Sequence, residues 1–188
     1  MSSKDNQVEE LKEAEKPKEA YKPKVEIKEE QKFGVIMCLF LHSDKHNKLM
    51  KSVTSMQLVA GKGILNNHRY YETINKSSGY PNKNHLSIIE REQIAEHEED
   101  IGKEILPGVI RSNIEIYGLV LTDFIGYRMK IGDTAIINVY KARVTCKQMD
   151  DIYRGLRKIT KNEKLGVIAE IEVSGEIKIG DKLIVLHD

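Results

Sequence analysis

Residues 166–186 read GVIAEIEVSGEIKIGDKLIVL, and this pattern is typical of short β-strands joined by tight turns. Apolar and polar residues alternate along three stretches, which are separated by Ser174-Gly175 and by Gly180-Asp181. Alternation with a period of two turns one face of a strand toward a core, and Ser-Gly and Gly-Asp pairs favour turns. We therefore predict strand, turn, short strand, turn and strand in this part of the chain.

The same pattern recurs upstream. The stretch YRMKIGDTAIINVYKARV (127–144) predicts two strands around the turn signal Gly132-Asp133. Helical spacing is clear in two stretches, at about 90–103 and in TCKQMDDIYRGLRKIT (145–160). Further strands are expected in FGVIMCLFLH (33–42), SVTSMQLVA (52–60) and SNIEIYG (112–118), with a short one opening at Leu86. Many short strands with few helices predict a mainly β fold with α, a closed or nearly closed β-barrel with peripheral helices.

Composition divides the 188-residue chain into two parts. Residues 1–31 are mostly Lys and Glu and carry few apolar side chains, so we expect a disordered tail and a globular domain over 32–188. The tail either solubilises the domain or docks a partner through its mixed charge. The net charge of +1 gives no support for a nucleic-acid or membrane partner.

The longest apolar run is VIMCLFL (35–41), which is far too short to span a bilayer. The two cysteines, Cys38 and Cys146, form neither a disulfide framework nor a zinc signature, so we expect the protein to reside in the reducing cytoplasm. Cys38 lies among apolar residues in a predicted strand, which favours a structural role. Cys146 lies between Arg143 and Lys147 just before a predicted helix, where positive charge would favour a thiolate. The pattern alone leaves Cys146 open between a reactive thiol and a buried, inert residue.

Two further sites have side chains suited to an anionic ligand. Arg111 and Asn113 follow a Pro-Gly turn at alternating positions, so both would point to one face and could hold a planar, phosphorylated ligand. The alternative is a surface salt bridge and a turn cap. His68 and Arg69 belong to NNHRYY (66–71) in a long loop over 61–85, a composition that also suits an anion. His68 lacks a second ligand at useful spacing, so metal binding is not expected there, nor at His42 with His46, which flank a turn.

Five motifs in a fixed order resemble the MOSC domain family, which is named for the C-terminal domain of molybdenum cofactor sulfurases. The resemblance covers about residues 33–187. The motifs are GKGILNNHRYY (61–71), LSIIEREQIAEHEEDIG (86–102), LPGVIRSNIEIYGLVLTDFIGYRMKIGD (106–133), TCKQMDDIYRGLR (145–157) and LGVIAEIEVSGEIKIGDKLIV (165–185).

This resemblance implies a β-barrel of the type first seen in a pyruvate kinase domain. It also implies binding of the molybdenum cofactor, a pterin dithiolene with a phosphate, as a domain that handles sulfur or metal through a reactive cysteine. That cysteine is Cys146, which would either carry a persulfide or ligate molybdenum. The cofactor-binding candidates are Arg111, Asn113, Arg69, His68, Arg143 and Lys147.

Two other functions are compatible with the sequence. The first is an oxidoreductase that reduces N-hydroxylated compounds, which would need an electron-donor partner because the chain has no flavin, haem or iron–sulfur motif. The second is a non-catalytic β-barrel binding module. Expected partners are molybdoenzymes or cofactor-biosynthesis proteins. No pyridoxal phosphate (PLP) is expected, because the chain is too short to include the aminotransferase-like domain of full sulfurases.

The sequence departs from the family pattern at two positions. The loop has Asn66-Asn67 before His68 where Gly-Asp is usual, so an acid is missing. Thr145 precedes Cys146 where proline is common. Threonine is a good helix-capping residue, so the local turn can still form.

Overall fold

The computed structural model describes residues 33–43, 50–68, 74 and 78–186. The predicted tail, His46 and Arg69 lie outside the described residues. The strands are β1 (Phe33–Leu41), β2 (Lys51–Val53), β3 (Ser55–Val59), β4 (Gly63–Ile64), β5 (Leu86–Glu90), β6 (Ile114–Tyr117), β7 (Arg128–Ile131), β8 (Ala135–Ala142), β9 (Val167–Val173), β10 (Gly175–Lys178) and β11 (Lys182–Val185). The helices are α1 (Arg91–Ile101), α2 (Gln148–Ile152), α3 (Leu156–Ile159) and the short 3-10 helix η2 (Leu121–Phe124).

The main sheet closes on itself to form a barrel. Its order is β11-β7-β8-β9-β5-β6-β1, and β11 pairs in turn with β1, where Phe33 lies opposite Ile184. Strand β2 extends the sheet beyond β1, and β10, β3 and β4 form a separate three-stranded sheet. All pairs in the barrel are antiparallel except β5 with β6, which helix α1 connects. The predicted mainly β fold with peripheral helices is confirmed, and the likeness to the pyruvate kinase barrel stays a prediction.

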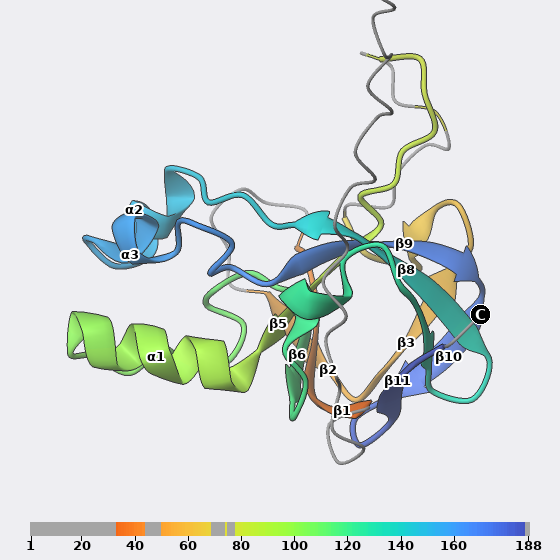
Figure 1. Cartoon of the computed structure of the whole chain (residues 1–188), viewed down its shortest axis with the longest axis horizontal. Helices are drawn as coiled ribbons and strands as arrows, with labels where there is room; N and C mark the ends of the chain where they lie inside the picture. The colour runs from red at the N-terminus through yellow and green to blue at the C-terminus, as the bar shows by residue number, and fades with distance from the viewer. Residues whose placement is uncertain (1–32, 44–49, 69–73, 75–77, 187–188) are drawn as a thin grey trace, which may run out of the picture.

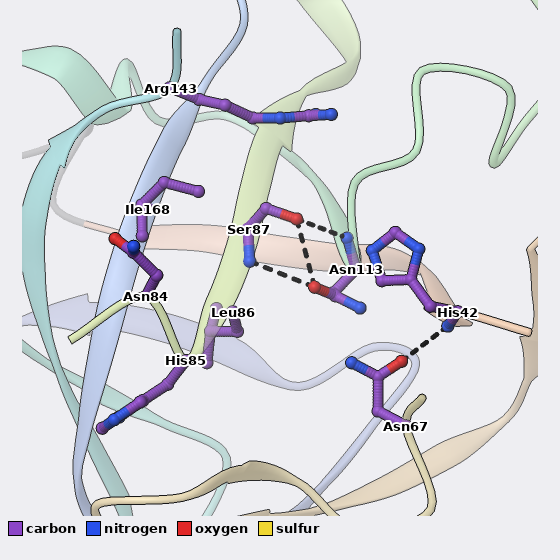
Figure 2. Close-up of a pocket in the computed structure, with 9 residues that line it drawn as sticks. All are labelled: His42, Asn67, Asn84, His85, Leu86, Ser87, Asn113, Arg143 and Ile168. Carbon is purple, nitrogen blue, oxygen red and sulfur yellow. Dashed lines mark hydrogen bonds between the residues drawn. The ribbon is translucent and has the colours of Figure 1, made fainter. Parts of the chain in front are cut away.

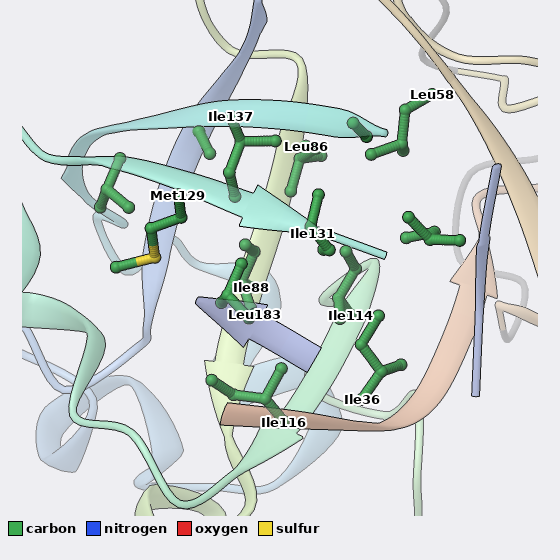
Figure 3. Packing of buried hydrophobic residues seen from close by; sticks show 14 of the residues in the cluster. Ile36, Leu58, Leu86, Ile88, Ile114, Ile116, Met129, Ile131, Ile137 and Leu183 are labelled. Carbon is green, nitrogen blue, oxygen red and sulfur yellow. The ribbon is translucent and has the colours of Figure 1, made fainter. Parts of the chain in front are cut away.

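Aliphatic side chains from nearly every strand fill the barrel interior (Figure 3). Ile36, Ile88 and Ile137 are among those with no exposed surface. Burying a side chain of this size contributes about 1.5–3 kcal/mol. The alternation read from the sequence thus sends one face of each strand into this core.

A second, smaller apolar cluster lies outside the barrel, where the helices gather to one side (Figure 1). Ile89 on β5 and Ile94 on α1 meet Met149 and Leu156 of the two short helices there. Strand β5 is buried along its whole length because Leu86 and Ile88 face the barrel core while Ile89 faces this cluster. The helices therefore fix β5, whose first residues line the pocket described below.

Two details of the predicted elements are wrong. The stretch over 52–60 is two strands, because the chain breaks at Thr54, with β2 pairing with β1 and β3 pairing with β10. The stretch over 145–160 is two short helices, because Tyr153 is extended and Gly155 takes a left-handed φ of 95°.

The helix at about 90–103 is confirmed and ends at left-handed Gly102, a common helix terminator. Among the described residues, no helix has the length and apolar character needed to cross a membrane.

Candidate functional site

A polar pocket lies at the end of the barrel where β1 and β8 finish and β5, β6 and β9 begin (Figure 2). Loop residues and strand ends supply its walls, and among the described residues that line it none is a carboxylate. The free volume is about 50 Å³. The lining residues are His42, Asn67, Asn84, His85, Leu86, Ser87, Asn113, Arg143 and Ile168.

Asn113 joins three strands at the floor of this pocket. Its Oδ1 accepts hydrogen bonds from the backbone N–H and the hydroxyl of Ser87, at 3.2 and 3.1 Å, and its Nδ2 donates to the Phe40 carbonyl at 3.1 Å. Asn113 is only 3% exposed. The carboxamide therefore links β5 and β1 at the start of β6. These bonds assign Asn113 to shaping the pocket, and its direct contact with a cofactor stays a prediction.

His42 connects the pocket to Arg111 and to the loop that carries Asn67. The His42 N–H donates to Asn67 Oδ1 at 2.6 Å, and the His42 carbonyl accepts from the His68 N–H at 3.2 Å. Arg111 Nη2 lies 3.4 Å from His42 Nδ1. The Arg111 backbone is left-handed, with φ of 61°, a costly conformation for a side chain of this size. Arg111 and Asn113 thus border the same pocket, although only Asn113 lines it.

Arg143 forms another wall of the pocket, immediately after β8. Its backbone N–H donates to the Gly166 carbonyl at 2.8 Å, and Nη2 donates to the Ile110 carbonyl at 3.1 Å. The guanidinium is thereby bonded to the turn that precedes β6. This places one permanent positive charge beside the neutral donors of the pocket (Figure 2).

Asn84 and His85 complete the pocket where the chain enters β5. The His85 Nδ1 accepts from the Ile171 N–H at 2.9 Å, and burial lowers the pKa of this imidazole below its ordinary value. The ring points away from Arg143 in Figure 2. Asn84 Oδ1 is buried and has no hydrogen-bond partner among the described residues. A ligand N–H would satisfy this acceptor, because buried carbonyl oxygens are normally hydrogen-bonded.

Cys146 lies on the segment between Arg143 and α2, outside the lining of the pocket. The thiol is exposed, and its contact is a long one of 3.9 Å to Gln148 Oε1. Helix α2 has five residues with Asp150 and Asp151 in its first turn, so the positive field expected at the sulfur is smaller than a long helix would give. Lys147 caps this helix and is exposed. The expectation that Cys146 could be buried is therefore wrong, and whether its thiol is reactive or inert stays a prediction.

Thr145 anchors the cysteine segment to α3. Its hydroxyl lies 2.8 Å from the Thr160 hydroxyl, which itself donates to the Leu156 carbonyl at 2.9 Å. Because the proton of Thr160 is used in that bond, Thr145 must be the donor between the two threonines. Thr160 is 1% exposed. The departure from proline at this position thus brings a specific contact of its own.

We expect a double-mutant cycle of Thr145→Val and Thr160→Val to give a coupling free energy of about 1 kcal/mol, the usual net contribution of one such hydrogen bond. Urea unfolding of the four proteins measures it. Thr145→Ser, which keeps the hydroxyl, is the matched control and should stay close to the parent protein. Additive single-variant effects would show that the two hydroxyls do not stabilise each other.

The other candidates from the sequence are placed as follows. His68 is exposed, and its backbone rather than its ring holds the pocket wall. Cys38 is half-buried on β1, where burial raises the pKa of its thiol and the charge of Glu115 adds to the rise. Among the described residues, no group of three or more His, Cys, Asp or Glu side chains could hold a metal ion.

Sequence reasoning missed a role for Asn84, His85 and Ser87. They belong to the mostly polar stretch NKNHLS (82–87), which leads into the buried strand β5, and this stretch was the available signal. His42 and Asn67 stood out in the sequence, but their mutual hydrogen bond joins residues 25 positions apart. Only the folded barrel shows that bond.

Comparison with known proteins agrees with this architecture. The family model described as MOSC domain matches residues 75–184. The chain therefore belongs to the MOSC domain family. Comparison with curated proteins found no match.

Several solved structures share the fold. The YuaD protein from Bacillus subtilis is 17% identical, with a TM-score of 0.70 over 81% of this chain and 95% of that chain. YiiM from Geobacillus stearothermophilus is 16% identical, with a TM-score of 0.62 over 82% of this chain and 75% of that chain. YiiM from Escherichia coli is 15% identical, with a TM-score of 0.59 over 82% and 70%. At these identities the likeness establishes the fold alone.

Proposed function

We propose that this MOSC domain binds the molybdenum cofactor at the barrel-end pocket and handles sulfur or metal through Cys146. The observation that carries the proposal is the lining of the pocket, which contains Arg143 and several amide and imidazole groups but no carboxylate. A pterin dithiolene with a phosphate presents an anionic end and a planar edge with hydrogen-bond donors and acceptors. This set of protein groups complements both parts of it.

The hydrogen-bond donors and positive charges of the pocket suit the phosphate of the cofactor. The buried acceptor without a partner among the described residues, Asn84 Oδ1, suits its pterin ring. Arg143 and Arg111 supply positive charge, and Asn67 and His42 supply hydrogen-bonding groups. Asn84 Oδ1, buried without a partner among the described residues, would accept from a pterin N–H. Sites that enclose a drug-sized molecule have volumes of about 300–1,000 Å³. A free volume of about 50 Å³ admits only part of such a ligand, so we place its phosphate beside Arg143 and one edge of its pterin at Asn84 Oδ1.

Cys146 is close enough to Arg143 along the chain for its thiol to react with a ligand that Arg143 binds. The two residues are three positions apart, so their Cα atoms lie within roughly 11 Å of each other, the reach of three extended residues. The exposed thiol is open to a second protein or small molecule. Sulfur transfer requires such access of a donor and an acceptor to the thiol.

In the sulfur-carrier form, the Cys146 thiolate attacks the outer sulfur of a donor persulfide. A new S–S bond forms on Cys146 while the donor's S–S bond breaks, and the donor leaves as a thiolate. The net change is transfer of one neutral sulfur atom, with no electrons gained or lost. In the ligand form, the same thiolate binds molybdenum as a soft donor. When bound, the cofactor supplies the redox chemistry.

The proposal is tested by purifying the protein from molybdate-fed cells and measuring molybdenum, pterin and cyanide-labile sulfur. We expect pterin in the parent protein and its loss in Arg143→Gln. Cys146→Ser should keep the pterin and lose either the molybdenum, if the thiol is a ligand, or the labile sulfur, if it is a carrier. Cys38→Ser is the matched control and should keep all three. A parent protein with neither pterin, molybdenum nor labile sulfur would overturn the proposal and leave a binding module of another kind.

Reduction of N-hydroxylated compounds with an electron-donor partner remains a prediction of the family resemblance, as do molybdoenzyme partners. A cytoplasmic location remains a prediction from the two cysteines. No contact among the described residues favours one of these over another. An assay with hydroxylamine-type substrates and an external electron donor tests the first of them.

A further inference from the structure

We propose that His97 is a pH-sensitive switch, which keeps the helical cluster packed beside the barrel when its imidazole is neutral and lets the cluster open in acid. The helical cluster consists of α1, α2, α3 and the second apolar cluster between them, and it lies to one side of the barrel (Figure 1). This property is separate from the proposed function, because it concerns how the helices are held rather than which ligand is bound. The two nitrogens of the His97 ring have different surroundings, and that difference is the basis of the switch.

His97 is a fully buried histidine on the inner face of α1. It has no exposed surface, and it lies three positions after Ile94 and four before Ile101. Residues at this spacing share one face of a helix, which here packs on the second apolar cluster. The Nε2 atom of His97 lies 2.7 Å from the Lys164 carbonyl oxygen. A carbonyl can only accept, so Nε2 carries the proton of the neutral ring and donates it.

The other ring nitrogen, Nδ1, is buried, and among the described residues no group forms a hydrogen bond with it. A second proton would have to bind at this atom. It would place a positive charge and an unpaired N–H beside aliphatic side chains, where neither is compensated. Burial therefore lowers the pKa of His97 below its ordinary value, although the bond to the Lys164 carbonyl acts in the opposite direction. The neutral ring fits its site and the charged ring does not.

Charged groups on the surrounding elements do not offset this cost of burial. Asp100 and Glu96 of α1 favour the charged ring and Lys164 opposes it, and each acts more weakly than burial does. The other elements packed against α1 are α3, β5 and β6, and their charged side chains are not among the groups that shift this pKa. Those side chains are Arg157, Lys158, Glu90 and Glu115.

The hydrogen-bond partner of His97 belongs to a strained turn that precedes β9. Asn162 and Glu163 take left-handed φ values of 57° and 68°, which is costly for residues that carry a side chain. Such a conformation persists only where surrounding contacts hold it. Helix α1 provides two of them, the bond from His97 to the Lys164 carbonyl and a bond at 2.8 Å from the N–H just before β9 to the Gln93 side chain. We therefore expect this turn to move when the His97 contact weakens.

Acid should open the helical cluster and neutral pH should keep it closed. In the open form His97 reaches water and regains its ordinary pKa of about 6.5. Below that pH the open form binds a proton that the closed form does not, so opening becomes more favourable by up to about tenfold per pH unit. Above it the ring is neutral in both forms, and the closed form is retained.

Hydrogen exchange of the full chain at pH 7 and pH 5, followed by mass spectrometry, tests the switch. After correction for intrinsic exchange rates, we expect the protection of α1 and of residues 161–166 to fall about fivefold or more between these pH values. The barrel strands should keep their protection. His97→Gln should abolish most of the fall, because its amide can donate to the Lys164 carbonyl but takes no proton. His68→Gln, which removes an exposed imidazole, is the matched control and should behave like the parent protein.

His97→Leu is a second variant, which can neither donate to the Lys164 carbonyl nor take a proton. Its helices should exchange faster than those of the parent at pH 7 and show little further change at pH 5. His85 also has a lowered pKa and is present in every protein, so only the difference between the parent and the His97 variants is assigned to the switch. An equal fall in the parent and both His97 variants would overturn the proposal, as would unchanged protection in the parent. Equal loss of protection in barrel and helices would mean global unfolding and would also contradict it.

Discussion

Replacement of Gly166 by alanine should lower the free energy of unfolding by about 4 kcal/mol or more, among the largest effects of a single substitution. Gly166 has a φ of 69°, and a Cβ there would lie 2.1 Å from the Ile88 carbonyl oxygen and 2.8 Å from the Ile89 Cα. Both contacts are with the backbone of β5, so no side-chain rotation can relieve them. Strand β9 would have to move away from β5.

The matched control for this prediction is Gly61→Ala. Gly61 has the same φ of 69°, but a Cβ there would have no heavy atom within 4 Å. Its replacement should cost only the strain of a left-handed backbone, about 1–2 kcal/mol. Denaturant unfolding of both variants separates conformational strain from the clash. A Gly166→Ala protein as stable as Gly61→Ala would contradict the close approach of β9 to β5.

Gly166 also belongs to the support of the pocket. Its carbonyl accepts from the Arg143 N–H, and its own N–H donates to Gln93 Oε1 of helix α1 at 2.8 Å. A shift of this residue would therefore displace Arg143 along with β9. We expect any Gly166→Ala protein that remains folded to retain less pterin than the parent protein, as well as to lose stability.

The second large effect is expected for Asn113→Ala, which should lower the free energy of unfolding by about 3 kcal/mol. The change removes the bonds to the Ser87 N–H and hydroxyl and to the Phe40 carbonyl, all inside the protein. Buried groups that lose their partners cost about 1–3 kcal/mol each, and water can re-satisfy only part of them. Urea unfolding provides the measurement.

Ser87→Ala is the control for Asn113→Ala. It removes one hydroxyl from the same network and leaves the Asn113 bonds to the Ser87 N–H and the Phe40 carbonyl in place. It should therefore cost about 1 kcal/mol. Equal losses in the two variants would mean that the Asn113 carboxamide does not join the strands as described.

Local sequence patterns predicted most of the strands, because alternation of apolar residues reports directly which side chains are buried. They could not predict which strands pair. Strand β10 follows β9 after one residue, yet it pairs with β3, more than 100 positions away. The break at Thr54 has the same origin, since β2 and β3 serve different sheets and nothing in their own sequence requires it.

The residues of the candidate site could also be predicted only in part from the sequence. Arg111 and Asn113 were read together because they follow one turn, and Arg143 was read with Cys146, whereas the structure places Asn113 and Arg143 in one pocket with Arg111 at its border. Their part in cofactor binding stays a prediction. Residue chemistry did not anticipate that the Asn113 carboxamide would bond to Ser87 and Phe40, since those partners lie 26 and 73 positions away. The exposure of Cys146 could not be predicted either, because the sequence around a loop residue does not reveal which side chains pack over it.

The pairing of β1 with β11 has a consequence for how the protein folds. These are the first and last strands of the described chain, with Phe33 opposite Ile184, so the ring closes only through a contact between residues some 150 positions apart. Contacts of this separation require a large loss of chain entropy before they stabilise anything, and proteins rich in them fold slowly. Until β11 is in place, Phe33, Gly34 and Val35 lack a strand to bond with at that edge of β1, while β2 pairs with the same edge further along, at Leu39–Leu41. We expect closure of the ring to be a late step, and an opened barrel to be the form most exposed to aggregation.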